Sequence, residues 1–277
     1  MHHIRRHTGV MVCLLFLIRN KKERDEMALS TFFSQNSSGA LAFSGGTDSS
    51  FLAWAAMKYG TGWKAYYIKT AFQPAFELED AKRVAEQCGI PLRIIPIDVL
   101  AQDAVTANPS NRCYFCKRIL FEQVLKQAAE DGCKLVIDGT NASDDAGDRP
   151  GMQALRELEV RSPLREAGLT KADVRRLSRE AGLFTWDKPS YACLATRIPT
   201  GTVITQEALE KVERGEQLLR EAGFRDIRIR LHGNAAVLQF PQKDMERAWT
   251  RREELHNMLS PLFPLAAIDL VPRLSKD

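Results

Sequence analysis

The sequence predicts an α/β fold, a parallel sheet with flanking helices, followed by a small α+β C-terminal domain. Three observations carry this prediction. From Gly39 onward, short apolar runs alternate with longer segments of helical period, as in βαβ units. Gly60 and Gly89 follow the first two helical segments, where helix C-termini often place glycine. Beyond Gly201 the order changes to helix, two adjacent strands, helix and strand.

The sheet domain is expected to contain four strands with helices between them. The strands are predicted at Ala40–Phe43, Lys64–Ile68, Leu92–Ile97 and Lys134–Asp138. The helices are predicted at Ser49–Tyr59, Glu77–Cys88 and Phe115–Glu130. One more helix should begin after an N-cap at Thr170, with Asp173 completing a near capping box, and end near Ala181.

Composition shifts near Pro199–Gly201, so we predict a domain boundary there. The sheet domain then covers residues 27–199, and residues 200–277 form a small domain for substrate binding or oligomerisation. Its elements are predicted at Gln206–Glu221, Arg225–Leu231, Ala235–Phe240, Lys243–Met258 and Ala266–Leu270.

Residues 1–26 differ from the rest of the chain. A basic start precedes the apolar run Val10–Ile18, and a charged run, Lys21–Glu26, follows. A signal peptide would explain the first two features, but no small-residue cleavage site is present. We therefore interpret this segment as an N-terminal extension, with Met27 as the first residue of the domain and residues 1–26 as a misassigned start.

Composition limits the function classes. Of 277 residues, 44% are hydrophobic and 27% are charged, which excludes a disordered chain. The net charge is +4, but residues 1–26 carry +3 of it, and the remaining +1 disfavours nucleic acid as a partner. Six cysteines are too few for a secreted disulfide scaffold, and no apolar run approaches the ~20 residues that span a bilayer. We expect a cytoplasmic protein with no membrane partner.

A glycine-rich loop, Ser44–Ser49, joins a predicted strand to a predicted helix. Its glycines allow a tight turn, and its amides and the helix N-terminus favour phosphate. It lacks the lysine of a Walker A loop and the third glycine of a dinucleotide fingerprint. It resembles the pyrophosphate loop of the ATP pyrophosphatase (PP-loop) superfamily, although an ordinary strand–turn–helix is the alternative. The resemblance implies that the loop holds the β- and γ-phosphates of ATP through Ser44, Gly45, Gly46, Asp48 and Ser49, and that Asp48 positions Mg²⁺.

A second loop follows the fourth predicted strand. Ligands of open α/β sheets bind beyond the carboxyl ends of the strands, so Gly139, Thr140 and Asn141 should also face ATP. The carboxylates that follow would share Mg²⁺, with Asp145 as a catalytic candidate, or would form a solvated acidic loop; they are Asp144, Asp145 and Asp148.

Three cysteines form the next candidate site. Cys113 and Cys116 form a CxxC pair, which by itself is compatible with redox, zinc or iron–sulfur chemistry. A zinc site usually has a second pair, and none is present. Together with Cys193, the pair could hold a [4Fe–4S] cluster with one open iron.

Several motifs in order resemble the LarE family, the ATP-dependent sulfur transferases of nickel-pincer nucleotide biosynthesis. The matching segments span about residues 40–240 and include Arg149–Gly151, Arg161–Leu164, Leu169–Arg175, Trp186–Pro189 and Cys193–Pro199. The resemblance implies an enzyme that uses ATP to adenylate a carboxylate of pyridinium-3,5-biscarboxylic acid mononucleotide. Sulfur then replaces AMP, which gives a thiocarboxylate.

The family has two sulfur strategies. One form sacrifices the sulfur of a single cysteine, and the other carries a [4Fe–4S] cluster on a CxxC pair and a third cysteine. Cys113, Cys116 and Cys193 match the cluster-bearing form, which we favour. Cys193 is then both a cluster ligand and a catalytic candidate. The sequence leaves the sulfur donor open.

A pair of arginines is expected to bind the substrate phosphate. Arg228, Arg230 and His232 alternate along one strand, and two arginines on one face can hold a phosphate from both sides. A solvated strand face is the alternative, but the LarE family has a matching pair that meets a phosphate. Arg197, beside the cysteine segment, is a third candidate, toward either AMP or substrate.

Two other functions remain open. One is a PP-loop tRNA thiolase with an iron–sulfur cluster, which should add a basic surface or an RNA-binding module that is not visible. The other is a non-enzymatic nucleotide-binding iron–sulfur sensor. An amide-forming ligase would leave the cysteines unexplained. The resemblance also implies a homo-oligomer, with a hexamer as the family's assembly.

Overall fold

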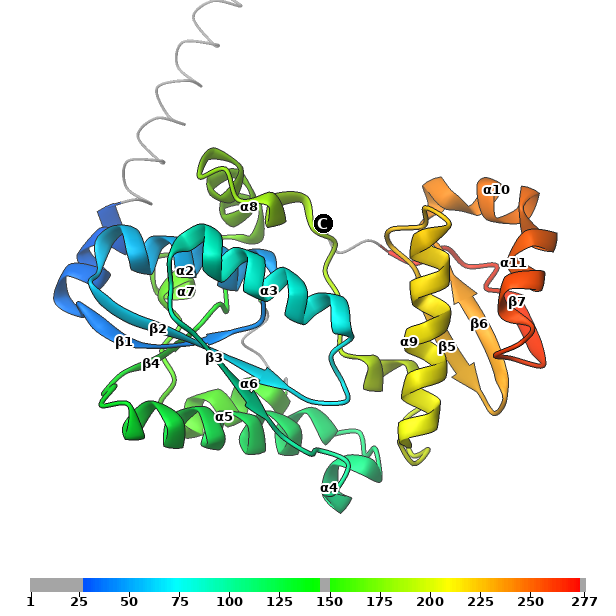
Figure 1. Cartoon of the computed structure of the whole chain (residues 1–277), viewed down its shortest axis with the longest axis horizontal. Coiled ribbons are helices and arrows are strands. Elements are labelled where there is room, and N and C mark those ends of the chain that lie inside the picture. The colour runs from blue at the N-terminus through cyan, green and yellow to red at the C-terminus, as the bar shows by residue number, and fades with distance from the viewer. Residues whose placement is uncertain (1–26, 145–149, 275–277) are drawn as a thin grey trace, which may run out of the picture.

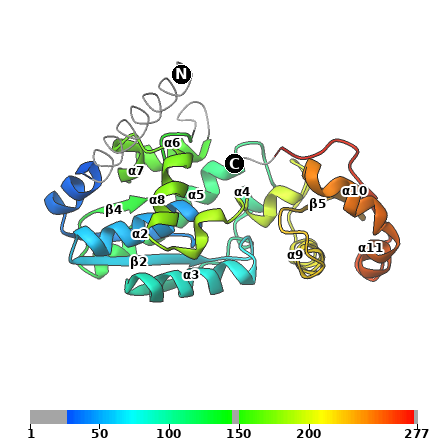
Figure 2. The same ribbon diagram turned by 90° about the horizontal axis from the view of Figure 1, so that it is seen from above.

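The computed structural model describes residues 27–144 and 150–274, which form a larger and a smaller lobe (Figure 1). The extension predicted at residues 1–26 lies outside the described residues. Two views at right angles agree that the small lobe lies beside the large lobe, at one end of it (Figure 2).

A four-stranded parallel sheet forms the centre of the large lobe, as predicted. Its order is β3-β2-β1-β4, and its strands are β1 (Ser38–Phe43), β2 (Gly62–Lys69), β3 (Leu92–Pro96) and β4 (Val136–Asp138). Strands β2 and β4 lie on either side of β1 and run parallel to it. The carboxyl ends of these three strands therefore meet at one edge of the sheet, where ligands of such sheets bind.

Helices cover both faces of this sheet. The described residues begin with a helix over residues 27–35, and the later helices are α2 (Thr47–Tyr59), α3 (Ala75–Cys88), α4 (Asp103–Thr106), α5 (Arg112–Glu130), α6 (Pro150–Glu157), α7 (Pro163–Glu166) and α8 (Lys171–Glu180). Apolar residues of α2, α3 and α8 share one core with Leu41 and Tyr67 of the sheet. On the other face, Val124 and Ala128 of α5 pack with Tyr66. The longer helices match the predicted ones within a few residues.

The small lobe is an α+β unit, also as predicted. Two short 3₁₀ turns, η1 (Phe184–Asp187) and η2 (Leu194–Arg197), lead into α9 (Gln206–Glu221), β5 (Arg228–His232), β6 (Ala235–Gln239), α10 (Gln242–Thr250), α11 (Arg252–Leu259) and β7 (Leu265–Ile268). Strand β6 lies in the middle, antiparallel to β5 and parallel to β7.

The single helix predicted over Lys243–Met258 is wrong. The chain leaves helical geometry at Arg251, whose guanidinium donates to the Ala222 carbonyl at 2.7 Å, and two helices result. The break lets Ala248 of α10 and Leu255 of α11 reach the same core.

One hydrophobic core crosses from lobe to lobe. Phe72, Val99 and Val105 of the large lobe pack in the same cluster as Phe224 and Phe240 of the small lobe. The backbone continues this contact, since the amides of Gly201 and Ile204 each donate at 2.8 Å to carbonyls of the α4 region. The boundary near residue 199 stays a prediction.

No helix within residues 27–144 and 150–274 combines the length and the apolar character needed to cross a bilayer.

The capping box at α8 forms as predicted, and it provides a test of local stability. The Thr170 hydroxyl accepts from the Asp173 amide at 3.2 Å, and the Asp173 carboxylate accepts from the Thr170 amide at 3.1 Å. We expect Thr170→Ala to lower the free energy of unfolding by about 1 kcal/mol in urea titrations. The exposed Thr202, replaced by Ala, is the control. Equal effects of the two variants would contradict the assignment.

Candidate functional site

The glycine-rich loop turns sharply between β1 and α2. Gly45 has φ of +69°, and a Cβ there would lie 2.9 Å from the Ala81 backbone and side chain, so only glycine fits. Gly46 is the N-cap of α2 and brings no side chain to its first amides. These amides and the positive end of the helix dipole are therefore available to an anion.

Two serine hydroxyls hold the loop in shape. The Ser44 and Ser49 hydroxyl oxygens lie 3.0 Å apart, and the Gly46 amide donates to the Ser44 hydroxyl at 3.3 Å. The Ser49 hydroxyl also donates to the Gly46 carbonyl at 3.2 Å. The loop is thus preorganised before any ligand binds.

The loop after β4 lies directly against the first loop. A Cβ on Gly139 would come within 2.8 Å of the Ser49 amide nitrogen. Asp138 fixes the turn, since its carboxylate accepts from the Thr140 hydroxyl and, at 2.6 Å, from the Ser162 hydroxyl. The structure therefore brings together the two loops predicted for ATP, including Thr140 and Asn141.

Asp48 has the features of a cation ligand. One carboxylate oxygen is 2.6 Å from the Lys171 ammonium, and the other is buried without a hydrogen-bond partner among the described residues. Burial raises the pKa of Asp48, with a contribution from Asp144, while Lys171 and Asn141 oppose the rise. An orphaned carboxylate oxygen near a second carboxylate suits Mg²⁺, which prefers oxygen ligands. Asp145 and Asp148 lie outside the described residues.

Two lysines flank the glycine loop, and the sequence analysis assigned a role to neither. The Lys171 ammonium contacts the loop through the Asp48 carboxylate. Lys188 lies 2.7 Å from the Asp80 carboxylate and 3.4 Å from the Gly45 carbonyl. Both lysines lie in segments that resemble the LarE family. That resemblance could have identified them as candidate site residues. Two ammonium groups beside the loop complement a polyphosphate.

A small apolar cavity of about 150 Å³ opens beside Ser44, at the carboxyl ends of β1 and β2. Its lining includes Phe43, Ile68 and Tyr67, whose hydroxyl is buried with no hydrogen-bond partner in the described part of the chain. It could take a flat, mostly apolar ring next to the phosphate loop. Sequence analysis did not find this cavity.

The three predicted cysteines come together at the junction of the lobes. Cys113 and Cys116 lie one turn apart in the first part of α5, and Cys193 precedes η2. Burial raises the pKa of Cys116 to about 12, and the nearby Cys193 and Cys113 add to the rise. Burial also raises the pKa of Cys193, where Arg112 opposes it. All three are free thiols, and Cys113 is exposed.

Within the described ranges, no three His, Cys, Asp or Glu side chains are grouped so that they could hold a metal ion. The iron–sulfur cluster predicted at the three thiols stays a prediction. Three thiols from two segments, with one thiol open to solvent, have the donor chemistry of an iron–sulfur cluster. Buried Arg112 fixes the two segments to each other, because it donates to Asn108 at 2.6 Å and to the Ala195 carbonyl at 3.0 Å.

Arg197 is engaged inside the protein. It is 1% exposed and donates to both carboxylate oxygens of the buried Glu216, at 2.8 and 3.2 Å. It also donates to the carbonyls of Ala192, at 2.7 Å, and Cys193, at 3.2 Å. In this arrangement Arg197 positions the cysteine segment. The predicted role in substrate or AMP binding stays a prediction.

The predicted arginine pair divides between two environments. Arg228 is buried and donates to the carbonyls of Ile227 and Ser190, whereas Arg230 is exposed and donates to Gln239 at 2.8 Å. Burial and, after it, the nearby Arg197 lower the pKa of Arg228 to about 10. Substrate binding by this pair stays a prediction.

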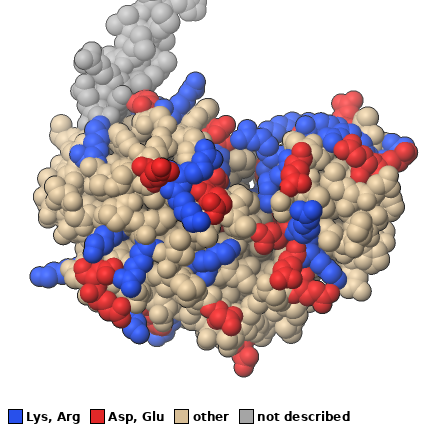
Figure 3. Space-filling model, viewed as in Figure 1, with Lys and Arg blue, Asp and Glu red and all other residues tan. Residues whose placement is uncertain are grey.

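Three arginines surround Tyr191. The guanidinium carbons of Arg197 and Arg228 each lie 4.6 Å from the ring centre, and Arg220 lies 5.9 Å from it. Glu216 pairs with Arg197 and Arg220, and Asp226 lies 3.8 Å from Arg228. The space-filling view shows basic side chains on the part of the small lobe that faces the notch between the lobes (Figure 3). A basic surface of this kind can attract an anion.

Glu77 connects the arginine cluster to the phosphate loop. Burial raises its pKa to about 7, and Lys188, Arg197 and Arg228 oppose the rise while Asp80 adds to it. Glu77 also lines the small cavity. Glu77 therefore lies near the loop, the cavity and the arginines, and Arg197 connects these to the cysteine segment through the Cys193 carbonyl.

Comparison with known proteins decides the family. No protein-family model matches the chain. A protein of Synechocystis sp. without a described function is 39% identical over 79% of this chain and 82% of its own length. The pyridinium-3,5-bisthiocarboxylic acid mononucleotide synthase of Lactiplantibacillus plantarum is 30% identical over 83% of this chain and 84% of its own length.

The chain belongs to the LarE family. More distant similarity extends to other PP-loop enzymes, such as a tRNA-specific 2-thiouridylase of Geobacter metallireducens, 30% identical over 40% of this chain and 38% of its own length. These relatives, with the sheet order and the loop geometry, make the chain an ATP-dependent sulfur transferase of the PP-loop type.

The raised pKa of Glu77 predicts a pH-dependent stability. In the unfolded chain the carboxyl titrates near 4.5, and in the folded chain near 7. The stability that depends on its proton is therefore fully present below pH 4.5 and lost as the pH rises through 7. We expect Glu77→Gln to remove this part of the decline, so that the variant gains stability relative to the wild type between pH 5 and 7.5 in urea titrations. A difference that stays constant with pH would show that Glu77 titrates normally.

Proposed function

We propose that this chain adenylates a carboxylate of pyridinium-3,5-biscarboxylic acid mononucleotide and converts it to a thiocarboxylate. The proposal is supported by three neighbouring groups: a glycine-rich loop at the start of α2, an arginine cluster and three thiols. The name of the Lactiplantibacillus plantarum relative supports the choice of substrate.

Binding of ATP follows from the first group. The amides of the loop and the N-terminus of α2 would hold the β- and γ-phosphates, and Lys171 and Lys188 would neutralise them. The cavity beside Ser44 would take the adenine ring. Asp48, with its unpaired oxygen, and Asp144 would hold Mg²⁺, which offsets phosphate charge when bound.

The substrate would enter between the phosphate loop and the arginine cluster. Arg228 and Arg230, in the small lobe, would hold its phosphate, and the pyridinium carboxylate would then face the α-phosphate. A carboxylate oxygen attacks that phosphorus, and the bond to the bridging oxygen of pyrophosphate breaks. Sulfur then attacks the carbonyl carbon, and AMP leaves with the electron pair.

The sulfur would come through the cysteine group. Cys113, Cys116 and Cys193 fit a [4Fe–4S] cluster, which would supply a site for a bound sulfide. The alternative, sacrifice of the Cys193 sulfur, would leave Cys113 and Cys116 without a role.

Release of pyrophosphate tests the reaction. With ATP and Mg²⁺, the full chain should release pyrophosphate only when pyridinium-3,5-biscarboxylic acid mononucleotide is present. Asp48→Asn should reduce the rate at least about tenfold, because it disturbs the metal site. The exposed Asp103, replaced by Asn, is the matched control. Release with tRNA in place of this substrate would favour the thiolase, and no release with either would favour the sensor.

An iron assay tests the sulfur source. Anaerobically purified protein should contain iron and acid-labile sulfide, and should lose both when Cys113, Cys116 or Cys193 is replaced by Ala. The control is Cys133→Ala, because Cys133 contacts the Tyr66 hydroxyl away from this group, at 3.7 Å. Iron-free protein that turns over once and converts Cys193 to dehydroalanine would instead establish the sacrificial route.

A further inference from the structure

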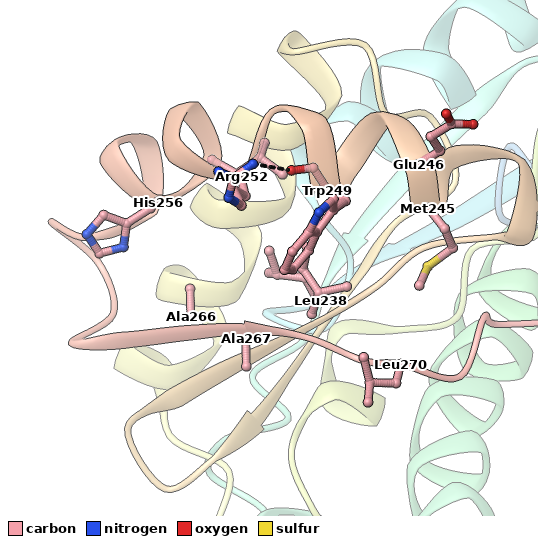
Figure 4. Close-up of a pocket in the computed structure, with 11 residues that line it drawn as sticks. Leu238, Met245, Glu246, Trp249, Arg252, His256, Ala266, Ala267 and Leu270 are labelled. Carbon is pink, nitrogen blue, oxygen red and sulfur yellow. Dashed lines mark hydrogen bonds between the residues drawn. The ribbon is translucent and has the colours of Figure 1, made fainter.

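An apolar groove in the small lobe takes no part in the proposed reaction. It has a volume of about 590 Å³ and lies between helices α10 and α11 on one side and β7 on the other (Figure 4). Apolar side chains such as those of Met245, Trp249 and Leu270 form most of its lining, so the groove does not specify the chemistry of a ligand. The buried charge of Arg112, beside the three thiols, does specify one, namely an anion.

Arg112 is a buried guanidinium that lacks a carboxylate partner. It is 7% exposed, and it donates to the Asn108 side-chain oxygen at 2.6 Å and to the Ala195 carbonyl at 3.0 Å, which are both neutral groups. No carboxylate in the described part of the chain pairs with it. The other deeply buried arginine of this region, Arg197, is paired with Glu216. Because buried charges are normally paired, Arg112 requires a negative partner that these contacts do not supply.

The side chain that holds Arg112 is an amide, in a place where a carboxylate of the same shape would neutralise the charge. Asn108 is 1% exposed and has φ of +53°, which is uncommon for a residue other than glycine. Its side-chain nitrogen donates to the carbonyls of Pro199, at 2.8 Å, and Ile198, at 3.3 Å. Asn108 therefore fixes both the guanidinium and the segment after Cys193, and it leaves the positive charge uncompensated.

The three thiols lie beside this charge. A guanidinium nitrogen of Arg112 is 3.9 Å from the Cys113 sulfur. Burial raises the pKa values of Cys193 and Cys116, and the charge of Arg112 opposes the rise at both. Helix α5 begins at Arg112, its N-cap Asn111 makes no side-chain capping bond, and its first turn contains no acidic residue. The positive end of the helix dipole therefore adds to the charge of Arg112.

We propose that Arg112 is the buried counter-ion of an anionic sulfur held at the three thiols, and a positioning residue for the step in which sulfur replaces AMP. The anion is a cysteine thiolate or a sulfide bound at the thiols. Anionic sulfur is the nucleophilic form, and a cation fixed beside it holds that sulfur in one place. The identity of the step rests on the proposed function, whereas the charge rests on the contacts of Arg112 alone.

Alkylation of Cys113 by two reagents tests the charge. Iodoacetate is an anion and iodoacetamide is neutral, and both react with the same thiolate, so the ratio of their rates reports local charge and not the pKa of the thiol. In the reduced, metal-free full chain at low salt, Arg112→Gln should lower this ratio at least about threefold, and Arg112→Lys should preserve it. Mass spectrometry of the Cys113 peptide measures both rates. The control is Arg118→Gln on the same helix, because the Arg118 guanidinium already pairs with Glu122 at 2.9 Å.

A second variant keeps Arg112 in place. Asn108→Asp gives the guanidinium a carboxylate partner, and it should lower the alkylation ratio by a similar factor. Thermal unfolding followed by circular dichroism shows which variants are folded. Either variant, folded and with the ratio of the wild type, would overturn the proposal.

The yield of sulfur transfer tests the positioning role. Arg112→Gln should lower the amount of thiocarboxylate formed per pyrophosphate released at least about tenfold, because Arg112 acts on the sulfur and not on adenylation. A changed alkylation ratio with an unchanged yield would overturn this role. In anaerobically purified protein, less acid-labile sulfide per iron in Arg112→Gln than in the wild type identifies the anion as a bound sulfide, and an equal value identifies it as a thiolate.

Failure of the proposed function has a different result. A wild type that releases no pyrophosphate with the pyridinium substrate would contradict that function, while the alkylation ratio would still report the charge at Cys113. Pyrophosphate release by the wild type, together with an alkylation ratio that neither variant changes, would overturn the role of Arg112 alone.

Discussion

The buried ion pair between Arg197 and Glu216 is the contact on which the rest of the candidate site depends. Both side chains are almost fully removed from solvent, and two hydrogen bonds join them. From this pair, Arg197 reaches the carbonyls before η2, while Glu216 accepts from the Ile229 amide of β5 at 2.9 Å. The cysteine segment and the strand with the arginine pair are thus held by one carboxylate. Loss of one partner from such a pair costs about 3–5 kcal/mol.

The same carboxylate draws several arginines together. Arg220 lies 4.0 Å from Glu216, and Arg228 lies close enough to Arg197 to lower its own pKa. The energetic cost of this crowding is present in the empty protein. A bound anion would relieve it, and binding that favours the folded state also stabilises it.

The sequence was sufficient for the parts of the protein that depend on local pattern. The periodicity of apolar residues and the positions of glycines located the four parallel strands and the helices around them. The capping box at Thr170 formed as expected. The glycine loop was recognisable because Gly45 needs a positive φ that other residues resist. The break at Arg251 was missed because the apolar period of α10 and α11 continues across it.

The site was harder to predict because its contacts join distant residues. Lys171 meets Asp48 across 123 positions, and Lys188 meets Gly45 across 143. Periodicity carries no information on such contacts. The alternation of side chains along the strand placed Arg228 and Arg230 on one face. In the structure, Tyr191 and Ser190 cover Arg228, whereas Arg230 stays exposed.

The core shared by the two lobes ties their unfolding together. Phe72, Val99 and Val105 pack with Leu194 and with the helices and strands of the small lobe. Neither lobe can melt without exposing apolar surface of the other, so the chain should lose its structure in one cooperative step. The segment with Cys193 packs against the core that the two lobes share. Because the shared core holds this segment, the thiol should be released from its neighbours in the same step in which the two lobes unfold.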